Sequence, residues 1–197
     1  ANEAFSLVES TDAKVALFVD EAVRLEVTNS DGSLIQYGGS GNETLTGGEK
    51  DDHLDGRLGD DTVNGGAGND TVYGDAGNDV LSGGTGNDIL KGGMGSDTLK
   101  GDAGADELRG NKGNDTLTYD SADTVINGGL GLDTLLIDTT VDLTGIDKLD
   151  GIEVLSLVNS TANNLTLDID DILDWVADDA LEIGSVADGK SKLVITG

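Results

Sequence analysis

A repeating pattern of hydrophobic and polar positions runs through the middle of the chain. It begins at Gly38, has a period of nine residues and continues without insertion to Leu136, which gives eleven phrases. The eighth place of every phrase is aliphatic: Leu45, Leu54, Val63, Val72, Leu81, Leu90, Leu99, Leu108, Leu117, Ile126 and Leu135. One apolar residue between polar neighbours predicts a short strand of about three residues with a single inward side chain.

Glycines separate these predicted strands. They allow backbone angles that other residues resist, so each phrase should form a tight turn followed by its strand. A three-residue strand cannot bury its face alone, and successive phrases must therefore stack. Two phrases, or eighteen residues, would make one flattened coil with a turn on each edge. We expect an all-β solenoid over residues 38–136.

The flanking segments differ from the repeats. Residues 1–37 carry two Val/Leu-rich runs and the turn sequence Asn29-Ser-Asp-Gly, which predicts two or three strands in an N-terminal β cap. Residues 137–197 lose the glycine frame but keep short β-like runs, as expected of a C-terminal capping region. One short helix is predicted near residues 168–179, where apolar residues recur at helical spacing: Ile169, Ile172, Leu173 and Val176.

The composition limits the possible partners. The 197 residues include 39 acidic and 11 basic side chains, for a formal charge of −28, so the surface repels nucleic acid and anionic membranes. No apolar run is long enough for membrane insertion. The absence of cysteine excludes disulfides and thiolate metal sites. A chain this acidic and poor in aromatic residues is expected to be disordered unless something neutralises its charge.

The sixth place of the phrases carries most of the candidate chemistry. It reads Glu43, Asp52, Asp61, Asp70, Asp79, Asp88, Asp97, Asp106, Asp115, Thr124 and Asp133. One aspartate in a glycine-rich turn is often only a turn former, but that does not explain eight consecutive copies. When the coils stack, sixth-place carboxylates would lie roughly 4.8 Å apart and repel one another unless cations separate them. The ligands are all oxygens, which favours calcium over magnesium.

The phrases resemble the glycine-rich nonapeptide GGxGxDxUx of RTX (repeats-in-toxin) proteins. The resemblance implies a right-handed parallel β-roll that binds calcium between two turns on the same edge. The first turn would supply the carbonyls of its second and fourth residues and its sixth-place aspartate. The turn two phrases later would supply the carbonyls of its first and third residues and its own aspartate.

The resemblance implies ligands at the following positions of this chain. One site takes Gly66, Gly68 and Asp70 with Gly83, Thr85 and Asp88, and another takes Asp75, Gly77 and Asp79 with Gly92, Met94 and Asp97. A third takes Gly84, Gly86 and Asp88 with Gly101, Ala103 and Asp106, and a fourth takes Gly93, Gly95 and Asp97 with Gly110, Lys112 and Asp115. Further sites pair Asp61 with Asp79, Asp52 with Asp70 and Asp115 with Asp133.

Three phrases depart from the motif. Lys50 replaces a fourth-place glycine, Glu43 is one methylene longer than aspartate, and Thr124 replaces the acid in a phrase without glycines. We therefore expect six good calcium sites and up to eight, with no calcium on that edge beyond Asp106.

The resemblance also implies a function. RTX proteins leave Gram-negative bacteria through a type I secretion machinery and fold outside the cell on calcium. Residues 129–175 are similar to the segment that follows the repeats in large RTX adhesins, which implies a secreted or cell-surface adhesin with a part in biofilms. We expect a monomer that is not an enzyme.

Two alternatives remain. RTX blocks also follow secreted enzymes, although no nucleophile–base pair is evident in this sequence. A sugar- or ice-binding face is the other, but the third-place residues are irregular. Tyr73, Tyr119 and Trp175 look too scattered for a sugar site, and His53 is expected to be exposed to solvent.

Overall fold

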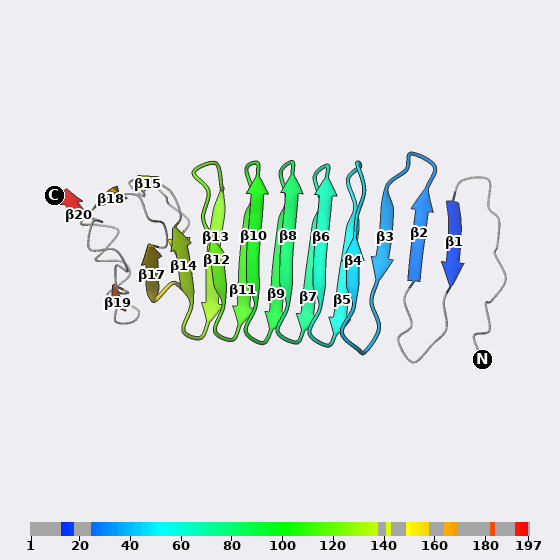
Figure 1. Ribbon diagram of the computed structural model, residues 1–197, viewed down its shortest axis with the longest axis horizontal. Helices are drawn as coiled ribbons and strands as arrows, with labels where there is room; N and C mark the ends of the chain where they lie inside the picture. The colour runs from blue at the N-terminus through cyan, green and yellow to red at the C-terminus, as the bar shows by residue number, and fades with distance from the viewer. Residues whose placement is uncertain are drawn as a thin grey trace.

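The computed structural model describes residues 25–137 and 149–157, together with separate strands at 13–17, 141–142, 164–168, 182–183 and 192–196. In this part of the chain the fold is all-β. Successive strands of the repeats belong alternately to two long sheets. Together they form a roll whose coils follow one another along its axis (Figure 1). No helix among the described residues is long and apolar enough to cross a membrane.

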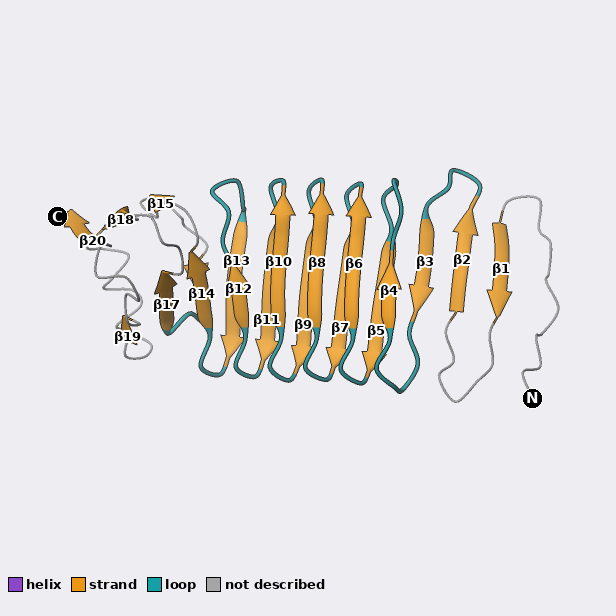
Figure 2. Cartoon of the chain, in the orientation of Figure 1, coloured by secondary structure: helices purple, strands orange, loops and turns teal. Residues whose placement is uncertain are grey.

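Two long sheets form the walls of the roll (Figure 2). Sheet A contains, in spatial order, β1 (Ala13–Leu17), β2 (Leu25–Asn29), β3 (Leu34–Tyr37), β5 (His53–Leu58), β7 (Thr71–Ala76), β9 (Ile89–Met94), β11 (Glu107–Lys112), β13 (Val125–Leu130) and β16 (Leu149–Asp150). Sheet B contains β4 (Thr44–Thr46), β6 (Thr62–Ala67), β8 (Val80–Thr85), β10 (Thr98–Ala103), β12 (Thr116–Thr118), β14 (Thr134–Ile137), β17 (Val154–Leu157) and β19 (Glu182–Ile183). A third sheet joins β15 (Val141–Asp142), β18 (Asn164–Asp168) and β20 (Lys192–Thr196).

The strand register confirms the predicted coil. Leu54 on β5 pairs with Val72 on β7, and Val72 pairs with Leu90 on β9, so each coil advances the chain by two phrases. All pairs between β3 and β13 in sheet A are parallel. The expected parallel β-roll is therefore the observed fold.

The strands are longer than the three residues expected from the hydrophobic pattern. β5 to β11 each span six residues, because the first three residues of the following phrase continue the ladder. The backbone bends at the second place of that phrase, where Arg57, Asp75, Asp102 and Asn111 have φ between 69° and 77°. Because the second-place residues of neighbouring coils share this left-handed conformation and pair with one another, the ladder continues through the bend into the turn.

The core is the column of eighth-place side chains. Each of them, from Leu45 to Leu135, is at most 1% exposed. Tyr119, Ile137, Ile152 and Leu155 extend this core toward the C-terminal end. Burial of one aliphatic side chain per phrase thus holds the two sheets together, as the stacking argument required.

Both ends of the roll carry further strands. β2 is antiparallel to both β1 and β3, and β3 pairs in parallel with β5. β16 and β17 continue the two sheets past the last nonapeptide. The helix predicted over residues 168–179 lies outside the described residues, apart from Asp168 at the end of β18.

Candidate metal-binding edges

The sixth-place acids form one column on each edge of the roll. The turns that follow sheet A, at the bottom of Figure 1, make the lower edge, and the turns that follow sheet B make the upper edge. The lower edge holds Asp61, Asp79, Asp97, Asp115 and Asp133, and the upper edge holds Asp52, Asp70, Asp88 and Asp106. Their exposure lies between 0 and 4%. The sequence therefore placed these nine aspartates correctly in two columns, but did not indicate how deeply they are buried.

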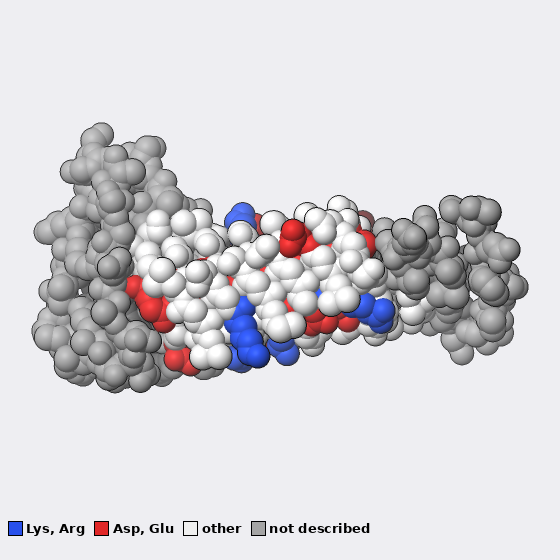
Figure 3. Space-filling model, turned by 90° about the horizontal axis from the view of Figure 1, so that it is seen from below, with Lys and Arg blue, Asp and Glu red and all other residues white. Residues whose placement is uncertain are grey.

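Because these aspartates are buried, the surface of the roll shows few acidic atoms for so acidic a chain. Figure 3 looks at the roll from below, toward the lower edge, and acidic atoms occupy only scattered places on that face. Most Lys and Arg atoms in the same view lie along one side, and a smaller group lies on the opposite side. Much of the acidic charge of the repeats therefore lies inside the turns rather than in bulk water.

One carboxylate oxygen of each acid connects successive coils. Oδ1 of Asp88 accepts the backbone N–H of Asp70 at 2.7 Å, and Oδ1 of Asp97 accepts that of Asp79 at 2.8 Å. The same bond recurs eighteen residues apart along both columns. Each aspartate therefore fixes the spacing between its own turn and the preceding turn.

The second carboxylate oxygen has no hydrogen-bond partner. This holds for the buried Oδ2 atoms of Asp61, Asp70, Asp79, Asp88, Asp97, Asp106, Asp115 and Asp133. A buried charged oxygen without a donor is costly unless a cation or a proton compensates it. Asp52 differs, because its Oδ2 accepts the N–H of Gly48 at 2.5 Å.

A first-place glycine leaves room beside each unpaired oxygen. A Cβ on Gly83 would overlap Oδ2 of Asp88 and would lie 2.7 Å from the carbonyl oxygen of Gly101. Gly65 and Gly74 have the same surroundings, formed by Asp70 with Gly83 and by Asp79 with Gly92. Because glycine has no side chain, a carboxylate oxygen of its own turn and a carbonyl oxygen of the next coil can both lie beside it.

The other predicted carbonyls face the same gaps between coils. The third-place carbonyls of Thr85, Met94, Ala103 and Lys112 point back, and each accepts an N–H at 2.9 Å from a fourth-place glycine, namely Gly68, Gly77, Gly86 and Gly95 respectively. The second- and fourth-place carbonyls point toward the next coil. Their oxygens would overlap a Cβ placed on the glycine eighteen residues later, as Gly66, Gly68, Asp75 and Gly77 show with Gly84, Gly86, Gly93 and Gly95 respectively. A carbonyl oxygen has two lone pairs, so a hydrogen bond does not prevent it from binding a metal.

This ligand set fits calcium. No group of three or more His, Cys, Asp or Glu side chains gathers among the described residues. The oxygens that meet between coils are those of the sixth-place carboxylates and of the backbone carbonyls. A mixed set of carboxylate and carbonyl oxygens suits calcium, which takes six to eight oxygen ligands in flexible geometry. The residues implied by the repeat motif are therefore the residues that could hold the ion.

Burial shifts the titration of these acids. It raises the pKa of Asp70, Asp88 and Asp133 to about 6 and that of Asp97 to about 7, while the N–H donated to each carboxylate opposes the shift and neighbouring aspartates increase it. The pKa values of Asp79, Asp106 and Asp115 are raised for the same first reason. The turns therefore take up a positive charge readily, either as protons or as a metal ion.

A second ladder, of fifth-place side chains, was not predicted. Oδ1 of Asn69 accepts the N–H of Asn87 at 2.8 Å, and Oδ1 of Asn87 accepts that of Ala105 at 2.9 Å. Asn78 and Asn114 do the same on the lower edge. The signal for it in the sequence is the recurrence of Asn or Asp at a spacing of eighteen residues.

The phrases that depart from the motif also differ in structure. The carboxylate of Glu43 folds back to accept the N–H of Gly39 at 2.8 Å. Thr124 donates its hydroxyl to the carbonyl of Asp106 at 3.0 Å. Beside it, Asp123 has a buried Oδ1 without a partner, and burial together with Asp106 raises its pKa to about 7. Sequence reasoning passed over Asp123 because it occupies the fifth place.

An aromatic row on sheet A includes Tyr73 and was not predicted from the sequence. His53 on β5 lies between Tyr37 and Tyr73, with ring centroids 5.8 and 5.4 Å away, and is half-buried rather than exposed. Arg57 covers the ring of Tyr37 at 4.9 Å, and Lys91 covers that of Tyr73 at 5.2 Å. Each tyrosine thus already has a cation on one face. Tyr119, by contrast, belongs to the core.

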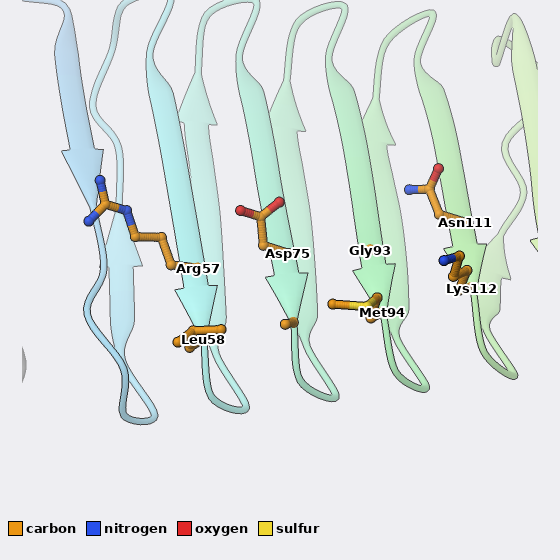
Figure 4. A pocket seen from close by; sticks show the side chains of 8 residues that line it. Arg57, Leu58, Asp75, Gly93, Met94, Asn111 and Lys112 are labelled. Carbon is orange, nitrogen blue, oxygen red and sulfur yellow. The ribbon is translucent and has the colours of Figure 1, made fainter.

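A hollow of about 500 Å³ follows the same sheet near the lower edge (Figure 4). It is lined by second- and third-place residues of consecutive coils: Arg57, Leu58, Asp75, Ala76, Gly93, Met94, Asn111 and Lys112. Leu58 and Met94 are more than half exposed in it. The hollow is thus the outer side of turns whose carbonyls face the gaps between coils.

Comparison with known proteins identifies the repeats. A family model described as the RTX calcium-binding nonapeptide repeat (4 copies) matches residues 37–72, 55–90, 64–99, 73–108, 91–125 and 101–135. These matches together cover half of the chain and coincide with the coils described above. No curated protein and no solved structure matches the chain.

Proposed function

We propose that this chain, which belongs to the RTX calcium-binding nonapeptide repeat family, is the calcium-dependent folding module of a secreted bacterial adhesin. The repeats bind calcium, as their family implies. The finer proposal is that the ions act as a folding switch, so that the roll forms where calcium is abundant and stays open where it is scarce.

The unpaired Oδ2 atoms carry this proposal. Eight buried carboxylate oxygens lie in two columns without a donor among the described residues. In the folded chain without metal they must either keep their protons or remain charged and poorly solvated. Calcium between the coils removes this cost, and because the gaps exist only in the folded chain, its binding energy becomes folding energy.

Such a switch suits export through a narrow channel. At the low free calcium of a cytosol the acidic turns repel one another and the chain remains extended. At the millimolar calcium outside a cell the ions bind, and the roll folds after it has left. This supports passage through a type I secretion machinery, with calcium as the first partner of the emerged chain.

An adhesin is the proposed parent protein because residues 129–175 are similar to the segment that follows the repeats in large RTX adhesins. The chain itself then has a structural role and no catalytic step, since its paired carboxylates already have calcium to bind. A sugar-binding face is the alternative, and the aromatic row of Tyr37, His53 and Tyr73 is its best support. The cations over both tyrosine rings favour the structural role.

Small-angle scattering tests the switch. A 197-residue unfolded chain has a radius of gyration of about 48 Å, and a folded chain has about half of this or less. We expect the larger value in chelator at pH 7.5 and the smaller one in millimolar calcium. A chain that is equally compact in both buffers would contradict the proposal.

A further inference from the structure

We propose that Glu153 completes the acid column of the lower edge and, together with Asp133, holds a calcium ion outside the nonapeptide frame. The inference rests on the calcium binding proposed above. It concerns a residue that lies beyond every repeat matched by the family model, which ends at residue 135.

Glu153 makes the hydrogen bond that defines the column. Its Oε2 accepts the backbone N–H of Asp133 at 2.7 Å, just as Oδ1 of Asp133 accepts that of Asp115 at 2.7 Å. The strand that follows is bonded in the same way, because Val154 N donates to the Asp133 carbonyl at 2.9 Å and Thr134 N donates to the Asp115 carbonyl at 2.8 Å. Glu153 therefore occupies the sixth place of a further turn.

The shorter turn explains why the acid is a glutamate. Asn127 on β13 pairs with Asp150 on β16, and this pair gives a common register point from which to compare the two turns. Asp133 follows Asn127 by six residues, whereas Glu153 follows Asp150 by only three. The extra methylene of glutamate lets a carboxylate reach the column from a backbone that makes a tighter turn. This changed spacing and residue type place it outside the repeat pattern.

An unpaired oxygen marks the gap between these two turns. Asp133 is 0% exposed, and its Oδ2 has no hydrogen-bond partner. A Cβ on Gly128 would lie 2.7 Å from that oxygen and would overlap the carbonyl oxygen of Gly151. This is the arrangement of the regular sites, where a first-place glycine leaves room for one carboxylate and one carbonyl of the next coil. Neither Asp133 nor Glu153 has a Lys, Arg or His ion pair among the described residues.

The additional ion would join the last regular coil to the C-terminal strands. Asp133 precedes β14, and Glu153 precedes β17, its neighbour in sheet B. Calcium between these two acids therefore holds β17 against the end of the roll. The column then contains one more calcium site than the nonapeptides alone indicate.

The test counts calcium ions per chain by native mass spectrometry in the wild type, Glu153→Gln, Asp133→Asn and the double variant, all of residues 1–197. Gln keeps an oxygen that accepts the Asp133 N–H, so a purely structural acceptor is preserved. We expect Glu153→Gln to bind one ion fewer. Asp133→Asn should bind two fewer, because Asp133 also faces Asp115, and the double variant should likewise bind two fewer. Glu107→Gln is the control for lost charge, since Glu107 pairs with Arg109 and is neither a sixth-place acid nor part of the lower edge.

An unchanged ion count in Glu153→Gln, with a wild type that binds calcium, overturns this inference and leaves the proposed function intact. A wild type that binds no calcium overturns both. If Glu153→Gln does not fold in calcium by circular dichroism, Glu153→Asp decides. Its carboxylate is too short for the three-residue turn, so the folded variant should lack one ion, and a full complement overturns the inference.

Discussion

Replacing one inner aspartate should have opposite effects with and without calcium. Asp88 on the upper edge is 1% exposed, its Oδ1 accepts the Asp70 N–H, and its Oδ2 is unpaired. Asp88→Asn keeps an oxygen for that hydrogen bond and places an amide beside the carbonyl oxygen of Gly101. It removes the charge that calcium requires and that the metal-free fold tolerates poorly.

The size of the stability change in chelator follows from the pKa of Asp88. Burial raises the pKa of Asp88 from 3.8 to about 6, so the folded, metal-free chain holds this proton more tightly than the unfolded chain does. The folded state is therefore favoured below pH 4 and loses this advantage as the pH rises through about 6. A shift of two units corresponds to about 3 kcal/mol at pH 7.5, or roughly 1–3 kcal/mol once screening by water is considered. Asn avoids that cost.

The assay compares folding in chelator with ion binding in calcium. In chelator at pH 7.5, Asp88→Asn should fold at a lower concentration of trimethylamine N-oxide than the wild type, since this osmolyte favours buried surface. In calcium, native mass spectrometry should show two ions fewer, because Asp88 faces both Asp70 and Asp106. Asp60→Asn is the matched control: Asp60 is an exposed fifth-place acid whose Oδ1 accepts the Asn78 N–H at 2.8 Å, and its change should affect neither result.

The reasoning is refuted if Asp88→Asn retains the full number of ions. It is also refuted if the variant requires more osmolyte than the wild type in chelator, because the buried charge would then not be the obstacle to folding.

Three other measurements test separate parts of the account. Gly83→Ala puts a methyl group against Oδ2 of Asp88, so calcium affinity by calorimetry should fall at least about tenfold, the loss expected when a metal site is disturbed; an unchanged affinity would show that this space is not the site. Leu90→Ala, at a position that is 0% exposed, should cost about 2–5 kcal/mol in urea unfolding with calcium present, whereas Ile89→Ala, at 37% exposure, should cost less, and equal losses would contradict the assigned core. Calcium affinity should fall as the pH drops from 8 to 5.5, because carboxylates such as that of Asp97, with a pKa of about 7, must lose protons to bind the ion. Calorimetry in two buffers should detect the released protons. A constant affinity would contradict the raised pKa values.

The periodic part of the fold could be predicted from sequence because one repeat determines two columns at once. Leu90 had to face inward with the other eighth-place residues, and Asp88 had to stack on Asp70, once eighteen residues made a coil. The length of the strands was not predictable in this way. The second-place bend at Asp75 depends on pairing with the next coil rather than on hydrophobic periodicity.

The missed features all arise between coils. The hydrogen bond between Asn69 and Asn87 joins turns that are eighteen residues apart, and it forms only when the coils stack. Tyr37, His53 and Tyr73 form a row only because β3, β5 and β7 are neighbours in sheet A.

A calcium titration followed by far-UV circular dichroism, with magnesium as the control, tests the central claim most directly. The account predicts a cooperative change from coil to β-structure between micromolar and millimolar calcium, and no such change with magnesium at the same concentrations. A chain that is already β-structured in chelator at pH 7.5, or that folds equally well with magnesium, would contradict the claim that calcium between the carboxylates drives folding.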